Sequence, residues 1–99
     1  MVKHIILWKL KSDMTEEEKA AARAEAKRRL ESLNGKIEGL VSLTVVTDRL
    51  PSSNADMMLE STFEDVSSLE GYQQNPLHLA AAGYVRSIVE TRLCLDYEE

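Results

Sequence analysis

Cysteine is almost missing from this chain, and its scarcity excludes several kinds of site. Cys94 is the only cysteine among 99 residues, so the chain can form no internal disulfide and no cysteine-based metal site. A chain of this length can bury one apolar core without such a cross-link. We therefore expect a single domain over residues 1–99 that uses no metal and no cofactor.

The chain also has few positively charged residues and no long apolar run. The chain has 12 Lys and Arg against 17 Asp and Glu, and its net charge is -5. Nucleic-acid binding needs a concentrated basic surface, so we expect no nucleic-acid partner. The apolar run at residues 2–8 is too short for a signal peptide or a membrane span. We expect a cytoplasmic protein that does not associate with membranes.

Four segments that are present have the alternating pattern typical of β-strands, namely residues 2–10, 40–48, 56–64 and 90–97. In the first segment, His4, Ile6 and Trp8 lie on one face, with Ile5 and Leu7 on the other. Both faces are apolar in the middle, which indicates a central strand that is covered on both sides. One layer of helices covers only one side of a sheet, so this strand is the first indication of a dimer.

The segment after the first strand carries a helix-start signal. Thr15 followed by Glu18 is a capping box, and Asn34-Gly35 is a typical helix end. We therefore predict a helix that begins after Thr15 and runs to about Leu33. The helix either packs close to the sheet or leaves room beneath it, and we expect close packing. Its apolar stripe is narrow and consists of Ala22, Ala26, Leu30 and Leu33.

A second helix start lies at Asn75-Pro76, after a short helix that Asp65 or Ser67 can cap. Asn suits the N-cap and Pro suits the first helical position, which predicts a helix through Ile88. At 100° per residue its apolar stripe has His78 at the edge and Arg86 on the opposite, solvent-facing side. The stripe consists of Leu77, Ala81, Tyr84, Val85 and Ile88.

The same break brings two chemically useful side chains together. Tyr72 ends the short helix and can approach His78 across the Asn75-Pro76 break. A helix N-terminus disfavours a protonated imidazole, so we expect His78 to be neutral. The sequence thus predicts a tyrosine–neutral-histidine pair at the rim of an apolar pocket, with His4 of the first strand converging on the same cavity.

The order of these elements is βαββααβ. We predict an α+β, ferredoxin-like protomer with a four-stranded antiparallel sheet and its helices on one face.

Three stretches resemble the stress-responsive A/B barrel (Dabb) domain family. They are Val2-Lys3-His4-Ile5-Ile6-Leu7-Trp8-Lys9, Tyr72…Asn75-Pro76-Leu77-His78 and Leu95-Asp96-Tyr97. The resemblance covers essentially the whole chain. It implies a homodimer in which the open sheet faces of two ferredoxin-like protomers close an α+β barrel.

The resemblance also implies candidate catalytic residues. The family includes plant polyketide cyclases of the olivetolic acid type, in which a histidine base and a tyrosine act on a poly-β-keto thioester. The matching positions are His78, Tyr72 and His4. Asn75 departs from the family's HP-x-H pattern. The first helix also lacks the bulk of the plant cyclases, which implies a changed pocket wall and therefore a changed substrate or none.

Three functions follow as hypotheses. In the first, a small apolar pocket binds or cyclises a polyketide-like or other small carbonyl compound. A neutral imidazole can take the acidic proton between two carbonyls, and a phenol can orient the substrate; such an enzyme would be a cofactor-free cyclase or lyase. The alternative is a non-catalytic, dimeric, stress-associated interaction protein with a filled pocket. The third is a barrel-type monooxygenase. The sequence leaves open whether the protein is an enzyme.

Overall fold

The computed structural model describes residues 1–99, with the element order that the sequence predicts. The strands are β1 (Val2–Leu10), β2 (Leu40–Val46), β3 (Met57–Phe63) and β4 (Val89–Glu98). The helices are α1 (Glu16–Glu31), α2 (Val66–Gln74) and α3 (Pro76–Ile88). None of these helices combines the length and the apolar character that crossing a membrane would require.

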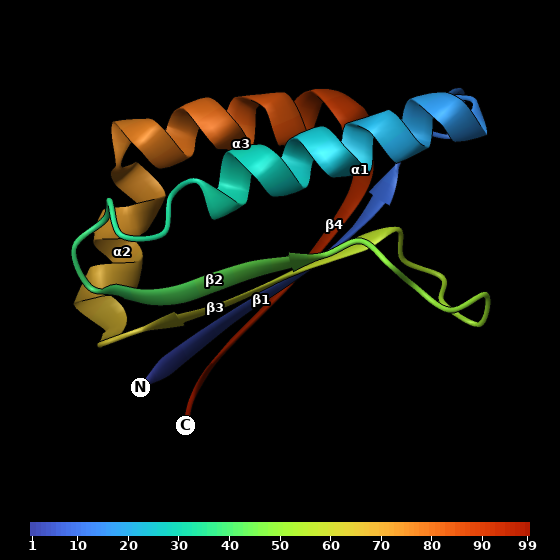
Figure 1. Ribbon diagram of the computed structural model, residues 1–99. Helices are drawn as coiled ribbons and strands as arrows, with labels where there is room; N and C mark the ends of the chain where they lie inside the picture. Colours follow the sequence, from blue (N-terminus) through green and yellow to red (C-terminus); the bar gives the residue numbers. More distant parts are fainter.

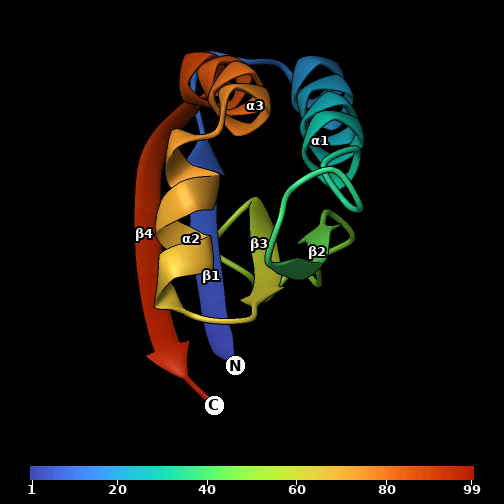
Figure 2. The same cartoon turned by 90° about the vertical axis from the view of Figure 1, so that its left-hand side faces the viewer.

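The four strands form one antiparallel sheet in the order β2-β3-β1-β4. All three helices lie on one face of this sheet (Figure 1). Figure 2 shows α3 on the β4 side of the sheet and α1 on the β2 side, while α2 contacts β1, β2 and β3. The predicted ferredoxin-like architecture is therefore confirmed.

The central strand β1 is covered on one side only within the protomer. His4, Ile6 and Trp8 are buried on the helix side, whereas Leu7 on the other side is 37% exposed. The helices form a single layer, so they cover one of the two faces that the sequence expects to be covered, and the partner expected on the other face stays a prediction. We call the uncovered side the open face. The register of the strands places these apolar residues on it: Ile5, Leu7, Val46, Met58, Leu93, Leu95 and Tyr97.

Helix α1 begins as predicted and ends slightly earlier. The Thr15 side chain accepts a hydrogen bond from the Glu18 backbone, and the Glu18 carboxylate accepts one from the Thr15 backbone. The regular α-helix stops at Glu31 rather than about Leu33. The reason is that the chain tightens there into i→i−3 hydrogen bonds, such as Leu33 to Leu30 at 3.1 Å.

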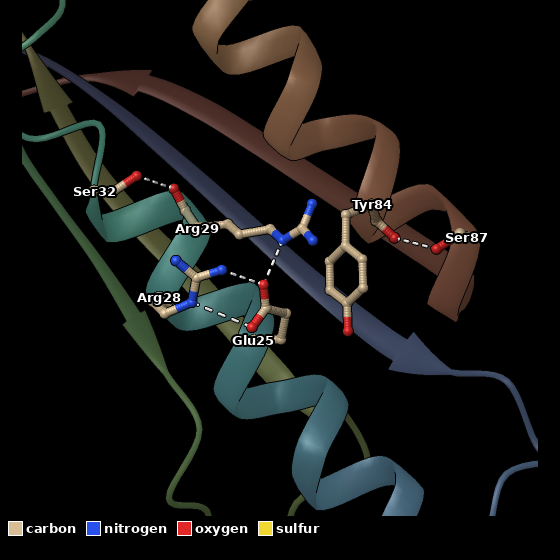
Figure 3. A network of polar contacts seen from close by, with 6 residues as sticks. All are labelled: Glu25, Arg28, Arg29, Ser32, Tyr84 and Ser87. Atoms are coloured by element: carbon tan, nitrogen blue, oxygen red, sulfur yellow. Dashed lines mark hydrogen bonds and ion pairs between the residues drawn. The ribbon is translucent and has the colours of Figure 1, made fainter.

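The inner face of α1 packs closely, as the small residues in its stripe suggested. Ala22 is 5% exposed and Ala26 is fully buried. Towards α3, the outer side of α1 forms a polar network (Figure 3). Glu25 accepts hydrogen bonds from Arg28 and Arg29, which lower the pKa of Glu25 to about 2. The Arg29 guanidinium lies 4.4 Å from the ring centroid of Tyr84, so α1 and α3 are joined by a cation–π contact.

The break between α2 and α3 forms as predicted, and the predicted stripe of α3 faces the core except at its first residue: Ala81 and Val85 are buried, and Tyr84 and Ile88 pack against the core. Of the two proposed caps of α2, Asp65 acts, accepting from the Ser68 backbone at 2.8 Å. Pro76 begins α3. Leu77 is 50% exposed, so it is wrong as a stripe residue. Apolar residues surround most of α3, so their periodicity alone does not determine where the buried side ends.

Candidate functional site

Three elements place the predicted site residues beside one another. His4 projects from the helix side of β1, Tyr72 lies in the last turn of α2, and His78 lies in the first turn of α3. The ring centroids of Tyr72 and His78 are 4.1 Å apart, and those of His4 and Tyr72 are 6.2 Å apart. The Tyr72 ring therefore contacts both imidazoles, and the structure brings all three residues together.

These three side chains line a cavity of about 210 Å³ between α3 and the sheet. Its apolar wall includes Ile6, Trp8, Leu59 and Val85. Typical ligand pockets have volumes of roughly 300–1,000 Å³, so this cavity suits a small compound. Only Leu30 of α1 reaches it, which agrees with the close packing of the alanine-rich part of that helix.

His78 is partly buried, and its Nδ1 atom is enclosed without a hydrogen-bond partner. Burial lowers the pKa of His78, and the positive charges of Arg86 and Arg92 lower it further. Hydrogen bonding of the imidazole to the Gln73 backbone raises the pKa of His78 and partly opposes these effects. The imidazole is thus neutral near pH 7, as predicted, but the main cause is burial rather than the helix N-terminus on which the sequence argument relied.

Tyr72 is almost completely buried, with 1% of its surface exposed. Burial raises the pKa of its phenol, and the charge of Arg92 partly opposes that shift. The phenol therefore keeps its proton throughout the neutral range. In this state Tyr72 can donate a hydrogen bond to a bound oxygen atom, but it cannot serve as a base.

His4 has a partner that the sequence did not reveal. Its Nδ1 atom is hydrogen-bonded to the carboxylate of Asp96, which the antiparallel register of β1 and β4 places directly opposite. A carboxylate only accepts, so Nδ1 carries the proton and Nε2 of a neutral His4 is left to accept one. The edge of Phe63 also packs against the His4 ring, at 6.3 Å between centroids. Asp96 could be identified only from the register between β1 and β4, and the alternation of residues in the sequence does not give that register.

The same corner contains three atoms of the kind that bind metal ions. The ligand atoms of His4, Cys94 and Asp96 all lie within 4.8 Å of one another. Imidazole, thiolate and carboxylate are zinc ligands. In the protein as it stands, however, the Asp96 carboxylate already bonds to His4, and burial together with that carboxylate raises the pKa of the Cys94 thiol. A metal ion would have to displace the hydrogen bond and the thiol proton, so the expectation of no metal stays a prediction.

Two arginines complete the cavity, and neither was predicted from the sequence as a cavity residue. Arg86 is exposed, as predicted, yet it lines the cavity instead of pointing away from it. Arg86 follows His78 and Ala82 at four-residue intervals along α3, and all three residues line the cavity. Arg92 reaches the cavity from β4, on the same face of the strand as Cys94 and Asp96.

The family model of the Stress responsive A/B Barrel Domain (Dabb) matches residues 2–99. No curated protein matches. A dimeric protein of unknown function with a ferredoxin-like fold from Bacteroides fragilis is similar, with 33% identity, a TM-score of 0.92, and coverage of 99% of this chain and 95% of that chain.

Two further structures are similar in fold alone. A dimeric ferredoxin-like protein of unknown function from Thermobifida fusca has 19% identity and a TM-score of 0.80, with coverage of 99% of this chain and 90% of that chain. Hydroxynitrile lyase from Passiflora edulis has 21% identity and a TM-score of 0.73, with coverage of 97% of this chain and 90% of that chain. The protomer fold therefore occurs in proteins described as dimeric and in one lyase.

Proposed function

This chain belongs to the stress-responsive A/B barrel (Dabb) domain family, and on that premise we propose that it is a homodimer whose cavity binds and enolises a small carbonyl compound. The observation that carries the proposal is the cavity wall. A neutral, partly buried imidazole with an enclosed, unpartnered Nδ1 atom lies 4.1 Å, between ring centroids, from a protonated phenol.

The proposed reaction begins at a carbon between two carbonyl groups. His78 takes a proton from that carbon, so the carbon–hydrogen bond breaks and its electron pair moves onto a carbonyl oxygen as an enolate. The Tyr72 phenol donates a hydrogen bond to this oxygen. In a substrate with a further carbonyl, the enolate carbon attacks it, a ring carbon–carbon bond forms, and the new alkoxide takes the proton back from His78.

Dimerisation through the open face is the second part of the proposal. Leu93 and Leu95 are each 64% exposed there, and Tyr97 is 46% exposed. An apolar area of this kind on a protomer is typical of an interface. The similar proteins from Bacteroides fragilis and Thermobifida fusca are described as dimeric, which supports the same arrangement here.

The test uses ethyl acetoacetate, a small 1,3-dicarbonyl compound. Exchange of its central protons in D₂O is followed by proton NMR at a pD where the uncatalysed exchange is slow. We expect the protein to accelerate the exchange and His78→Ala to lower that acceleration about 10²-fold, with a smaller loss for Tyr72→Phe. Gln74→Ala, an exposed neighbour outside the cavity, serves as the control.

An acceleration that survives His78→Ala would contradict the assigned base. If the wild-type protein gives no acceleration, and thermal-shift screening with β-keto and phenolic acids finds no ligand, the non-catalytic interaction protein becomes the better description. A Soret shift on titration with haem would instead support the monooxygenase alternative.

A further inference from the structure

The cavity wall has an unusual balance of charge for so acidic a chain. Asp and Glu outnumber Lys and Arg by 17 to 12 in the sequence. The cavity, however, is lined by two arginines, Arg86 and Arg92, and by no carboxylate. The arginines come from different elements, α3 and β4, so their presence at one cavity is a product of the fold.

Neither arginine has an ion-pair partner within the protomer. The carboxylates that pair with arginine elsewhere in the chain serve Arg28, Arg29 and Arg49. Arg86 and Arg92 form no salt bridge. Both are near enough to the His78 imidazole for their charges to lower its pKa. Arg92 also hydrogen-bonds the Cys94 side chain. A guanidinium offers several N–H donors in a planar fork that matches a carboxylate, so two guanidiniums without a carboxylate partner beside a cavity form a receptor for an anion.

The rest of the cavity wall would contact the part of the ligand that lies away from the arginines. Ile6, Trp8 and Leu59 provide apolar surface, and the His78 and Tyr72 rings lie on the same cavity as the arginines. A ligand with an anionic group at the arginines can therefore extend a short carbon chain along these rings. The small volume, about 210 Å³, favours a compact acid.

Resting on the proposed function, we infer that the substrate class is a carboxylate-bearing 1,3-dicarbonyl compound, whose carboxylate Arg86 and Arg92 bind while its dicarbonyl part faces His78 and Tyr72. The arginines then select the ligand and fix its direction in the cavity. A neutral ester of the same compound keeps the dicarbonyl chemistry and loses the anchor.

The experiment compares 2,4-dioxopentanoate with its methyl ester by titration calorimetry on the full chain at pH 7.5. We expect the acid to bind at least about tenfold more tightly than the ester, with an affinity that falls as salt is raised. Arg86→Gln and Arg92→Gln should each weaken binding of the acid about tenfold and leave the affinity for the ester unchanged. Lys36→Gln removes one exposed positive charge outside the cavity and should alter neither affinity.

The outcomes separate the inference from the proposal on which it rests. Equal binding of acid and ester by the wild-type protein, or an acid preference that survives both arginine substitutions, overturns the anion site and leaves the enolising cavity in place. Binding of neither compound overturns both. Because the first comparison uses only the wild-type protein, it does not depend on whether the variants fold.

Discussion

Tyr72 is the residue on which the site depends most. Its ring is buried, packs 4.9 Å from Phe63 between centroids, and contacts the two histidines. It therefore belongs to the core and to the cavity at once. Removing the hydroxyl should test function, whereas removing the ring should open the core at a cost of about 3–5 kcal/mol. This is why Tyr72→Phe, rather than Tyr72→Ala, is the informative variant.

His78 should make stability depend on pH. Above about pH 6.5 the imidazole is neutral in both folded and unfolded chains. Below that value the unfolded chain takes up a proton that the folded chain resists, because burial lowers the pKa of His78. The free energy of unfolding should thus fall as pH drops from about 6.5 towards the lowered folded pKa, and level off below it.

Urea unfolding at half-unit steps from pH 8 to pH 5 measures this slope. His78→Gln, which cannot titrate, should flatten the curve in that window, and Gln74→Ala should keep the wild-type slope. If wild-type and His78→Gln proteins lose stability in parallel, His78 is not held neutral by the fold.

At the level of the elements, helix boundaries were more predictable than helix faces. The Thr15–Glu18 capping box and the Asn75-Pro76 start are local signals, and each forms where the sequence places it. The limits of the buried side of α3 depend on how the helix meets α1 and the sheet, and apolar residues on most of its circumference obscure them. For this reason Leu77 was misplaced and Arg86 was missed as a cavity residue.

The cap at Asn75 should stabilise the helix that carries His78. Its side chain accepts a hydrogen bond from the Leu77 backbone at 2.9 Å. Asn75→Ala leaves that donor without its partner and should lower the free energy of unfolding by about 1 kcal/mol. Asn75→Asp keeps the acceptor and should stay close to wild type. Equal losses for both variants in urea unfolding would mean that Asn75 acts through another contact.

At the level of the whole molecule, the sequence predicts a dimer through a discrepancy. The strand β1 is apolar on both faces, whereas a single layer of helices covers only one of them. The order of the elements along the chain and the three ring-bearing candidate residues were also predicted from the sequence. Asp96 and Arg92 were not, because they join the site through a register between strands at opposite ends of the chain.

The open face should be where two protomers meet. Leu93→Lys places a charge on a residue that is already 64% exposed in the protomer, so it should dissociate the dimer without unfolding the chain. Leu50→Lys is the matched control, since Leu50 is 73% exposed in the β2–β3 connection, outside the sheet. Sedimentation at micromolar concentration measures both. A stable interface should bury more than roughly 1,000 Å² in total, and a monomeric wild-type protein would contradict the proposal.

The pairing of β1 with both β3 and β4 also determines when the sheet can be completed during synthesis. The strand β1 precedes both of its neighbours in the chain, and all the other helices and strands lie between it and β4. Until β4 leaves the ribosome, one edge of β1 has no partner, and the backbone of Met1 has no Glu99 to accept a hydrogen bond from. Such long-range pairing slows folding and prolongs the exposure of an apolar strand. A nascent chain that lacks β4 should therefore bind chaperones until β4 emerges.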